Sequence, residues 1–168
     1  MVKKIYPTSE HLHKLFRYEE GELYWRIKKR GISSKKPIGA GCKTRYKLVM
    51  IDRGVYLLHR VIFNMFNSGS AEFIDHINGN TLDNRVENLR AASIYQNNQN
   101  TKKSKRNTSG FKNISWDKVR AKWRVCLHSR GKTVSSKRFD ELGKAIDYAK
   151  SMREQFHGEF ANHGMEYA

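Results

Sequence analysis

The sequence predicts an α+β protein built from two small domains. Residues 122–128 alternate apolar and polar side chains, which is the period of a strand with one buried face. Residues 59–66 and 140–156 place apolar side chains three and four positions apart, which is the period of a helix with one buried face. A polar, basic stretch separates these groups of elements, and 168 residues are enough for two small domains.

The first part of the chain is expected to hold one helix and three strands. Thr8 or Ser9 can cap the helix, because a side-chain oxygen there accepts from backbone N–H groups of the first turn. The strand-sized segments are residues 23–27, 46–51 and 55–58. A turn at residues 52–54 joins the last two into a hairpin, and residues 28–37 form a basic loop.

A second group of elements extends to residue 103. Residues 59–66 form a helix, and residues 74–77 form a short strand. Asn78-Gly79 is a strong signal for a tight turn. Residues 91–102 are expected to be helical, although their asparagines lower helix propensity.

The C-terminal part is predicted to be a small three-stranded antiparallel sheet packed on one helix. The expected strands are residues 111–116, 122–128 and 133–139, and the helix follows at 140–156. This arrangement leaves the cationic face of the sheet free for a nucleic acid. The domain limits that follow are 1–103 and 109–168, with residues 104–108 as a basic linker.

The net charge of +17, from 33 Lys and Arg against 16 Asp and Glu, indicates a polyanionic partner. The charge is uneven: residues 101–138 carry 13 basic side chains and one acidic side chain, whereas residues 72–90 carry two basic and four acidic ones. An acidic island between basic blocks fits a cation site on a DNA-binding surface. An ordinary solvated loop would have the same charge pattern.

We expect an intracellular protein, in the cytoplasm or nucleoid of a host cell, that is neither secreted nor bound to a membrane. No apolar run approaches the roughly 20 residues of a membrane span. The basic N-terminus has no apolar stretch behind it, as a secretory signal would. Cys42 and Cys126 are too few for a disulfide framework or a four-cysteine zinc site.

Residues 74–97 carry the side chains most informative about chemistry. They combine one aspartate, an adjacent histidine and a series of asparagines. Carboxylate and amide oxygens are hard ligands that suit Mg²⁺ or Mn²⁺. Histidine is the side chain best suited to take a proton from water near neutral pH. In so basic a chain, these residues indicate metal-assisted hydrolysis of a phosphodiester.

The same region resembles the HNH homing endonucleases of phage type. The matching segments are His59-Arg60, Ile74-Asp75-His76-Ile77-Asn78-Gly79, Asp83-Asn84-Arg85, Asn88-Leu89-Arg90 and Gln96-Asn97. The resemblance implies a ββα-metal core, about residues 55–103, in which two short strands and a helix hold one divalent ion. Mg²⁺ is the expected ion, and Mn²⁺ is expected to substitute for it.

The resemblance also implies a role for each matching residue. Asp75 and Asn97 would be the metal ligands, and His76 would be the general base that activates water. Asn88 would hold the loop so that His76 points at the scissile phosphate. His59 recurs in the family pattern, and either packing or an accessory role is compatible with it. The final position is Asn97 where many nucleases of this name carry histidine; homing-type relatives use asparagine there.

The C-terminal part resembles the AP-two (ethylene-response-factor) domain, which lays a three-stranded sheet into the major groove of DNA. The matching residues are Ser109 to Trp116, Lys122 to Val125, Phe139, Ala145 and Gly158 to Ala161. The expected DNA-binding residues are Lys112, Trp116, Arg120, Lys122, Arg124, His128, Arg130 and Lys132. The third strand departs from the family, because Ser135-Ser136-Lys137 stands where a leucine-glycine pair is usual. A solvated basic sheet is the alternative.

Together these features predict a metal-dependent, site-specific endonuclease that acts on double-stranded DNA. One alternative is a DNA-binding regulator with an inactive nuclease domain, which would need no intact metal set. Another is a basic RNA-binding protein, but the predicted sheet lacks an exposed aromatic pair for stacking bases. No obligate protein partner is evident, and a homodimer is compatible with the sequence.

Overall fold

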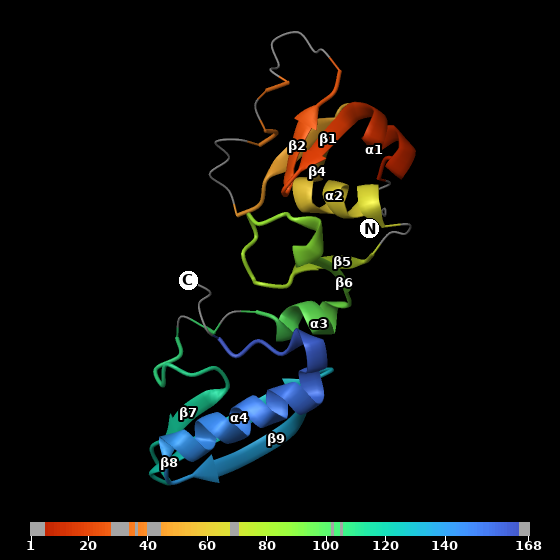
Figure 1. Ribbon diagram of the computed structural model, residues 1–168. Coiled ribbons are helices and arrows are strands. Elements are labelled where there is room, and N and C mark those ends of the chain that lie inside the picture. The colour runs from red at the N-terminus through yellow and green to blue at the C-terminus, as the bar shows by residue number, and fades with distance from the viewer. Residues whose placement is uncertain are drawn as a thin grey trace. The chain divides into compact units, whose positions relative to one another are not determined.

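The computed structural model describes residues 6–27, 34–35, 37–39, 45–67, 71–101, 103–104 and 106–164. It divides into two compact units, Met1–Ala91 and Ala92–Ala168, which are taken one at a time below (Figure 1). Most of the basic loop predicted at residues 28–37 lies outside the described residues, as does Cys42. In the described part of the chain, no helix is long and apolar enough to cross a membrane.

The N-terminal unit consists of short helices and two-stranded sheets. Its elements are α1 (Ser9–Leu15), β1 (Phe16–Glu19), β2 (Glu22–Trp25), β3 (Leu48–Ile51), β4 (Gly54–Leu57), α2 (Leu58–Phe66), β5 (Phe73–His76), the 3-10 helix η1 (Val86–Asn88) and β6 (Leu89–Ala92). Strands β1 and β2 pair antiparallel, as do β3 and β4, and β5 pairs with β6. The predicted hairpin at residues 46–58 is therefore confirmed.

The core of this unit forms where α1 and α2 pack together beside the hairpins. The Thr8 side chain caps α1 by accepting from the backbone N–H of His11, which confirms one of the two predicted caps. Phe16, the residue directly after α1, begins β1 and is fully buried. Strand β1 was not predicted, because its four residues are too few to show a clear alternation.

The C-terminal unit contains the predicted three-stranded sheet with one helix. Its elements are α3 (Ile94–Gln99), β7 (Ile114–Asp117), β8 (Lys122–Ser129), β9 (Lys132–Phe139), α4 (Leu142–His157) and the 3-10 helix η2 (Gly158–Phe160). The antiparallel strands lie in the order β7-β8-β9, and α4 crosses one face of the sheet (Figure 1). Ile114, Val125, Ala145 and Ala149 form the buried core between helix and sheet.

The helix predicted over residues 91–102 is wrong at both ends. Strand β6 extends to Ala92, and α3 covers only Ile94–Gln99. Ser93 starts the helix with a capping box, in which its hydroxyl accepts from the backbone N–H of Gln96 and the Gln96 side chain accepts from the backbone N–H of Ser93. Because α3 belongs to the second compact unit, the units divide before the linker predicted at residues 104–108. The sequence-based domain limits stay a prediction.

Candidate active site

The candidate site of the N-terminal unit is built where β5 ends in a tight turn. Ile74, Asp75 and His76 are all buried, so both faces of the strand are covered at this point. Asp75 is 6% exposed and His76 is 4% exposed. The turn predicted at Asn78-Gly79 is present: the N–H of Gly79 donates to the carbonyl of His76 at 2.8 Å, and Gly79 has a φ of 68°.

Asn88 fixes the loop that follows the turn. Its side-chain oxygen accepts from the backbone N–H of Asn78 at 3.0 Å. Its Nδ2 donates to the Asn78 side-chain oxygen at 3.1 Å and to the Asp83 carbonyl at 2.8 Å. The backbone of Asn88 also accepts from the N–H of Ile77 at 2.9 Å. One buried asparagine therefore joins both ends of the loop that begins at His76.

A second buried asparagine holds the imidazole of His76. The Oδ1 of Asn84, a residue only 2% exposed, lies 3.1 Å from His76 Nε2. Because an amide oxygen only accepts, this contact places the proton on Nε2 and the lone pair of the neutral ring on Nδ1. Burial lowers the pKa of His76, and this effect outweighs the opposing influence of Asn84 and Asp75. The ring is therefore neutral at physiological pH and able to accept a proton.

His59 and Tyr46 lie next to this imidazole. The ring centroid of His59, on α2, is 5.0 Å from that of His76, and Tyr46 is 5.2 Å from His59. Burial, with the nearby His76 and Arg60, lowers the pKa of His59 to about 3. His59 therefore stays uncharged at physiological pH and packs against His76 as a neutral ring.

Asp75 is ion-paired within the unit. Its Oδ2 accepts from Nε of Arg90 at 3.0 Å and from a terminal guanidinium nitrogen at 2.8 Å. Arg90 lies on β6, the partner strand of β5, so the sheet itself positions this pair. The guanidinium supplies the positive charge that a buried carboxylate requires.

The two expected metal ligands both carry oxygen donors, the kind of ligand that a hard divalent cation prefers. Asp75 offers a carboxylate, and the half-buried Asn97, on α3 of the C-terminal unit, offers an amide oxygen. Among the described residues, no group of three or more His, Cys, Asp or Glu side chains could hold a metal ion.

The β1–β2 hairpin contacts residues 84–86 of the loop that follows His76. The hydroxyl of Tyr18 accepts from the backbone N–H of Val86 at 2.9 Å. Gly21, at the tip of the hairpin, has a φ of +86°, and a Cβ added there would lie 2.7 Å from the backbone nitrogen of Arg85. The chain can therefore pass this close to Asn84 and Arg85 only with glycine at position 21.

Three residues of this region were missed as functional candidates. Asn84 was expected to be a turn or cap residue, and Arg90 was not assigned a role. Arg45, an exposed cation stacked 5.3 Å from the ring of Tyr46, lowers the pKa of His76 by its charge. Arg45 gives no sequence signal, because it lies some thirty residues before the motif. Arg90 could have been found, since Asp75 is the kind of buried acid that needs a cationic partner.

The second candidate surface is the face of the C-terminal sheet opposite α4, called here the outer face. Register pairs Arg124 with Ser115 on one side and with Arg138 on the other, and all three point away from the core residue Val125. Lys122, two positions before Arg124, shares this face. Arg138 was not among the expected DNA-binding residues.

Not all of the expected DNA-binding residues lie on the outer face. Trp116 pairs with Trp123, and their rings lie 4.9 Å apart on the side that packs against α4. Any contact of Trp116 with DNA would therefore come from the edge of the sheet. Lys112 donates to the carbonyls of Gln99 at 2.8 Å and Thr101 at 2.6 Å.

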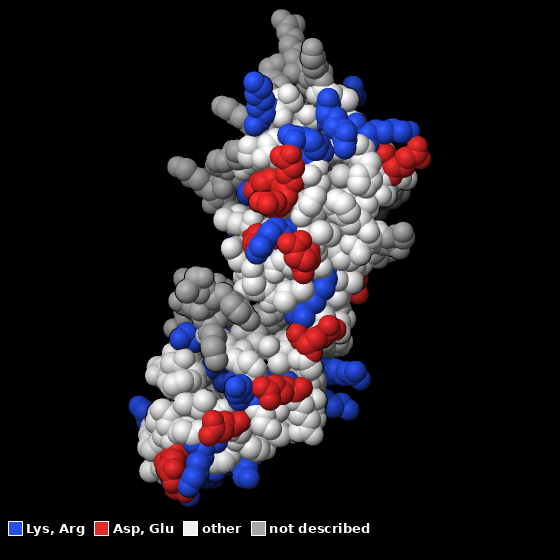
Figure 2. Space-filling view, viewed as in Figure 1, with Lys and Arg blue, Asp and Glu red and all other residues white. Residues whose placement is uncertain are grey.

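The other expected residues lie in turns and at strand ends. Arg120 lies in the β7–β8 turn, 3.5 Å from a carboxylate oxygen of Asp117. His128, Arg130 and Lys132 flank the β8–β9 turn and are exposed. The helix side of the unit, which faces the viewer in Figure 2, shows carboxylates among the cations. It therefore lacks the continuous basic surface that a DNA backbone prefers.

Comparisons with known proteins bear on the N-terminal site and the helix that follows it. Residues 56–99 match the family model described as HNH endonuclease. The chain is 39% identical over 89 residues to Protein 3.8 of Escherichia phage T7, covering 53% of this chain and 73% of that protein. It is 33% identical over 116 residues to a protein of Acanthamoeba polyphaga mimivirus named an uncharacterized HNH endonuclease, covering 67% of this chain and 59% of that protein. No solved structure matches.

Proposed function

Since residues 56–99 form an HNH endonuclease domain, we propose that this chain is a site-specific endonuclease of the homing type that hydrolyses phosphodiester bonds of double-stranded DNA. One observation carries the proposal most directly. A buried, neutral histidine lies beside a buried aspartate, and the histidine is held at Nε2 by a buried amide. A general base needs this fixed orientation and this protonation state.

In the proposed mechanism, His76 accepts a proton from the attacking water at Nδ1. The contact of Asn84 with Nε2 fixes the direction of the lone pair on Nδ1. Burial lowers the pKa of the ring, which keeps Nδ1 unprotonated. Asn88 fixes the loop and thereby the backbone at His76. The exposed Arg45 is close enough to lower the pKa of His76 by its charge, and the same charge can attract the scissile phosphate.

A divalent ion, Mg²⁺ or in its place Mn²⁺, would be held by Asp75 and Asn97. When bound, such an ion stabilises negative charge on the phosphate and on the leaving 3′ oxygen. Arg90 holds the Asp75 carboxylate in place on β5 through two hydrogen bonds to Oδ2.

The C-terminal unit would hold the DNA target. Arg124, Arg138 and Lys122 on the outer face would contact mainly phosphates, which position the duplex. This is the AP-two-like role expected from the sequence, with Arg138 added to the set. One such nuclease site cuts one strand at a time, so a nick is the expected first product.

The test is cleavage of supercoiled DNA by the wild type and by His76→Ala, with Mg²⁺, with Mn²⁺ and with EDTA, on a panel of substrates. We expect metal-dependent nicking that EDTA and His76→Ala abolish, with DNA binding unchanged in the variant. A general base contributes about 10²- to 10⁴-fold to the rate, so the loss should be at least of that size. An intact substrate under every condition, with tight binding retained, would instead identify a DNA-binding regulator.

A further inference from the structure

The C-terminal unit contains a cavity that the proposed nuclease chemistry does not use. Its volume is about 360 Å³, and it lies between the end of α3, the β8–β9 turn and the end of α4. Its basic lining residues are Lys112, His128, Arg130 and His157, and none of the residues lining it is acidic. A cavity of this size can hold a small ligand. Three of these four residues were expected to meet DNA from the outer face, but here they surround one cavity.

His157 is the buried polar group of the cavity. It is 8% exposed, and its Nε2 lies 3.2 Å from the carbonyl oxygen of His128. Because a carbonyl only accepts, the proton is on Nε2. The other ring nitrogen, Nδ1, is buried without a hydrogen-bond partner. A buried nitrogen without a partner is unfavourable, and protonation next to an anion would give this one both a hydrogen and an acceptor.

The cations behind the cavity are crowded. Arg153 is 4% exposed and donates to the carbonyl of Lys112 at 2.9 Å, so the two basic residues are held together. Burial and the charge of Arg153 lower the pKa of Lys112 to about 8. Burial lowers the pKa of His157 as well, with smaller contributions from Lys112 and Arg153. The partners of the Lys112 ammonium are backbone carbonyls rather than a carboxylate.

We propose that this cavity is a binding site for a phosphate group, with Lys112, Arg130 and His157 as its donors. A phosphate accepts several hydrogen bonds, and its negative charge would offset the repulsion between the neighbouring cations. The cavity is larger than one phosphate, which leaves room for part of the attached sugar. The phosphate can come from a nucleic acid backbone or from free phosphate. This site is independent of cleavage at His76.

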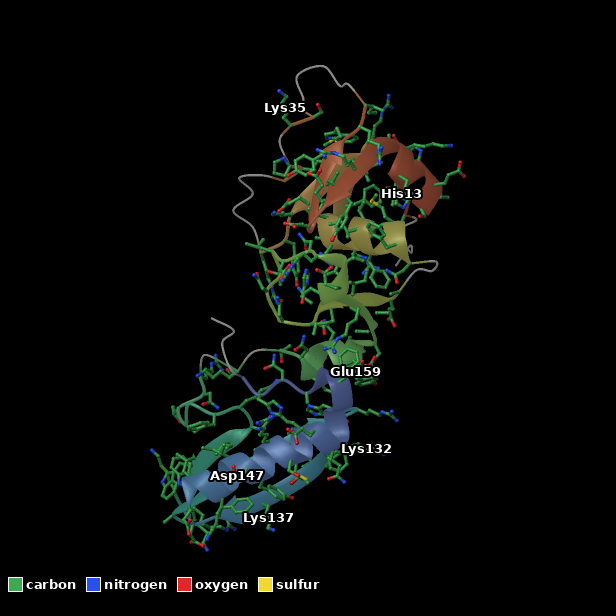
Figure 3. The ribbon with its side chains drawn as sticks, viewed as in Figure 1. His13, Lys35, Lys132, Lys137, Asp147 and Glu159 are labelled. Atoms are coloured by element: carbon green, nitrogen blue, oxygen red, sulfur yellow. The ribbon has the colours of Figure 1, made fainter. Side chains whose placement is uncertain are left out.

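The site also touches the helix that carries Asn97. The carbonyls of Gln99 and Thr101, which accept from Lys112, follow directly on the helical turn of Asn97. The Gln99 side chain donates to the hydroxyl of Ser129 in the β8–β9 turn at 3.2 Å. Glu159 lies at the end of α4 beside α3 (Figure 3), in a neighbouring cavity that also contains Arg130 and His157. A phosphate bound here would therefore stabilise the position of α3 within the C-terminal unit.

The first experiment is a titration of the full chain with inorganic phosphate, followed through the NMR signals of the histidine rings. We expect saturable shifts of the His157 ring. Arg130→Asn should weaken this binding by about tenfold, as the loss of one charge-assisted hydrogen bond would. Asparagine tolerates the left-handed backbone of Arg130, whose φ is 49°, so this variant keeps the turn. His157→Gln tests the ring directly.

The matched control is Lys137→Gln, which removes one charge at the far end of β9 from Lys132 and the cavity (Figure 3). It should leave phosphate binding unchanged. Equal losses in Lys137→Gln and Arg130→Asn, or no saturable shift at His157, would overturn the site. A DNA duplex that shifts His157 and competes with phosphate identifies the backbone as the source. Phosphate binding without that competition identifies free phosphate. Neither result depends on whether wild-type protein cuts DNA.

Discussion

The loop around His76 and the outer face of the C-terminal sheet are both expected to meet DNA, yet they are built in opposite ways. Around His76, two buried asparagines bond to the ring and to the loop backbone. On the outer face, Lys122 and Arg138 form ion pairs with the acidic side chains of Asp140 and Asp117. Chemistry requires one fixed orientation, because a base must point at one atom. Binding to the phosphates of a DNA backbone needs no single side-chain orientation, because charge acts over several ångströms.

This contrast predicts the largest effect for Asp75→Ala. It should abolish cleavage by removing a proposed metal ligand. It should also destabilise the protein by about 3–5 kcal/mol, because the largely buried ion pair with Arg90 would be broken. Cleavage assays and urea unfolding measure the two effects separately.

The double variant Asp75→Ala with Arg90→Met separates the two roles. Removing both charges should recover most of the lost stability, since a buried ion pair can be replaced by apolar side chains at little cost. Cleavage should stay absent. Recovered cleavage in the double variant would mean that Asp75 serves the fold and not the metal.

Asn84→Ala should have the next largest effect on activity. Removing the acceptor at Nε2 frees the imidazole to rotate, and losses of such supporting groups typically cost about 10- to 100-fold. The loss should appear in kcat, with DNA affinity unchanged. Asn84→Asp keeps an acceptor and should retain more activity than the alanine variant. Glu87→Gln, at an exposed position between Asn84 and Asn88, is the control and should behave like wild type.

The sequence predicted the parts of this site that follow one another in the chain, and it missed those that meet only in space. The Asn78-Gly79 turn and the α2 helix could be predicted because turn residues and helical periodicity are local signals. The support that Tyr18 and Gly21 give to residues 84–86 could not, since it joins segments more than sixty residues apart. The face on which Trp116 lies, which is shared with Trp123, follows from the pairing of β7 with β8 and not from the sequence around it.

Gly21→Ala should show how far the His76 loop depends on the hairpin behind it. The new Cβ would approach the backbone of Arg85, and position 21 has a left-handed φ, so we expect a loss of about 1–3 kcal/mol in stability. The rate of cleavage should fall too, because a shift of the Arg85 backbone would move its neighbour Asn84, which holds the imidazole of His76. Gly110→Ala is a matched control: its φ is +80°, but a Cβ there would meet nothing within 4 Å. It should cost stability by about 1 kcal/mol and leave cleavage intact.

The smallest effects belong to the outer face. Arg124→Gln should weaken DNA binding a few-fold and reduce the salt dependence of the affinity by about one phosphate contact, with kcat at saturating DNA unchanged. Lys137→Gln removes the same charge from a side chain that stacks on Phe139 and Tyr148, next to α4, and should change the affinity less. Measuring the DNA affinity of both variants at several salt concentrations distinguishes the effect of Arg124→Gln from that of Lys137→Gln.

Asp117→Asn should raise the affinity for DNA, whereas Arg124→Gln lowers it, so this variant also tests whether charge on the outer face sets the affinity. Asp117 accepts from Arg138 at 2.8 Å, and the Arg138 contact holds the pKa of this carboxyl below its usual value. Removing the acid releases Arg138 and Arg120 and lowers the negative charge beside them. DNA affinity should therefore rise a few-fold, and the salt dependence should become steeper. If the affinity instead falls, Asp117 holds Arg138 in its binding position, and the outer face binds DNA through side chains of fixed orientation.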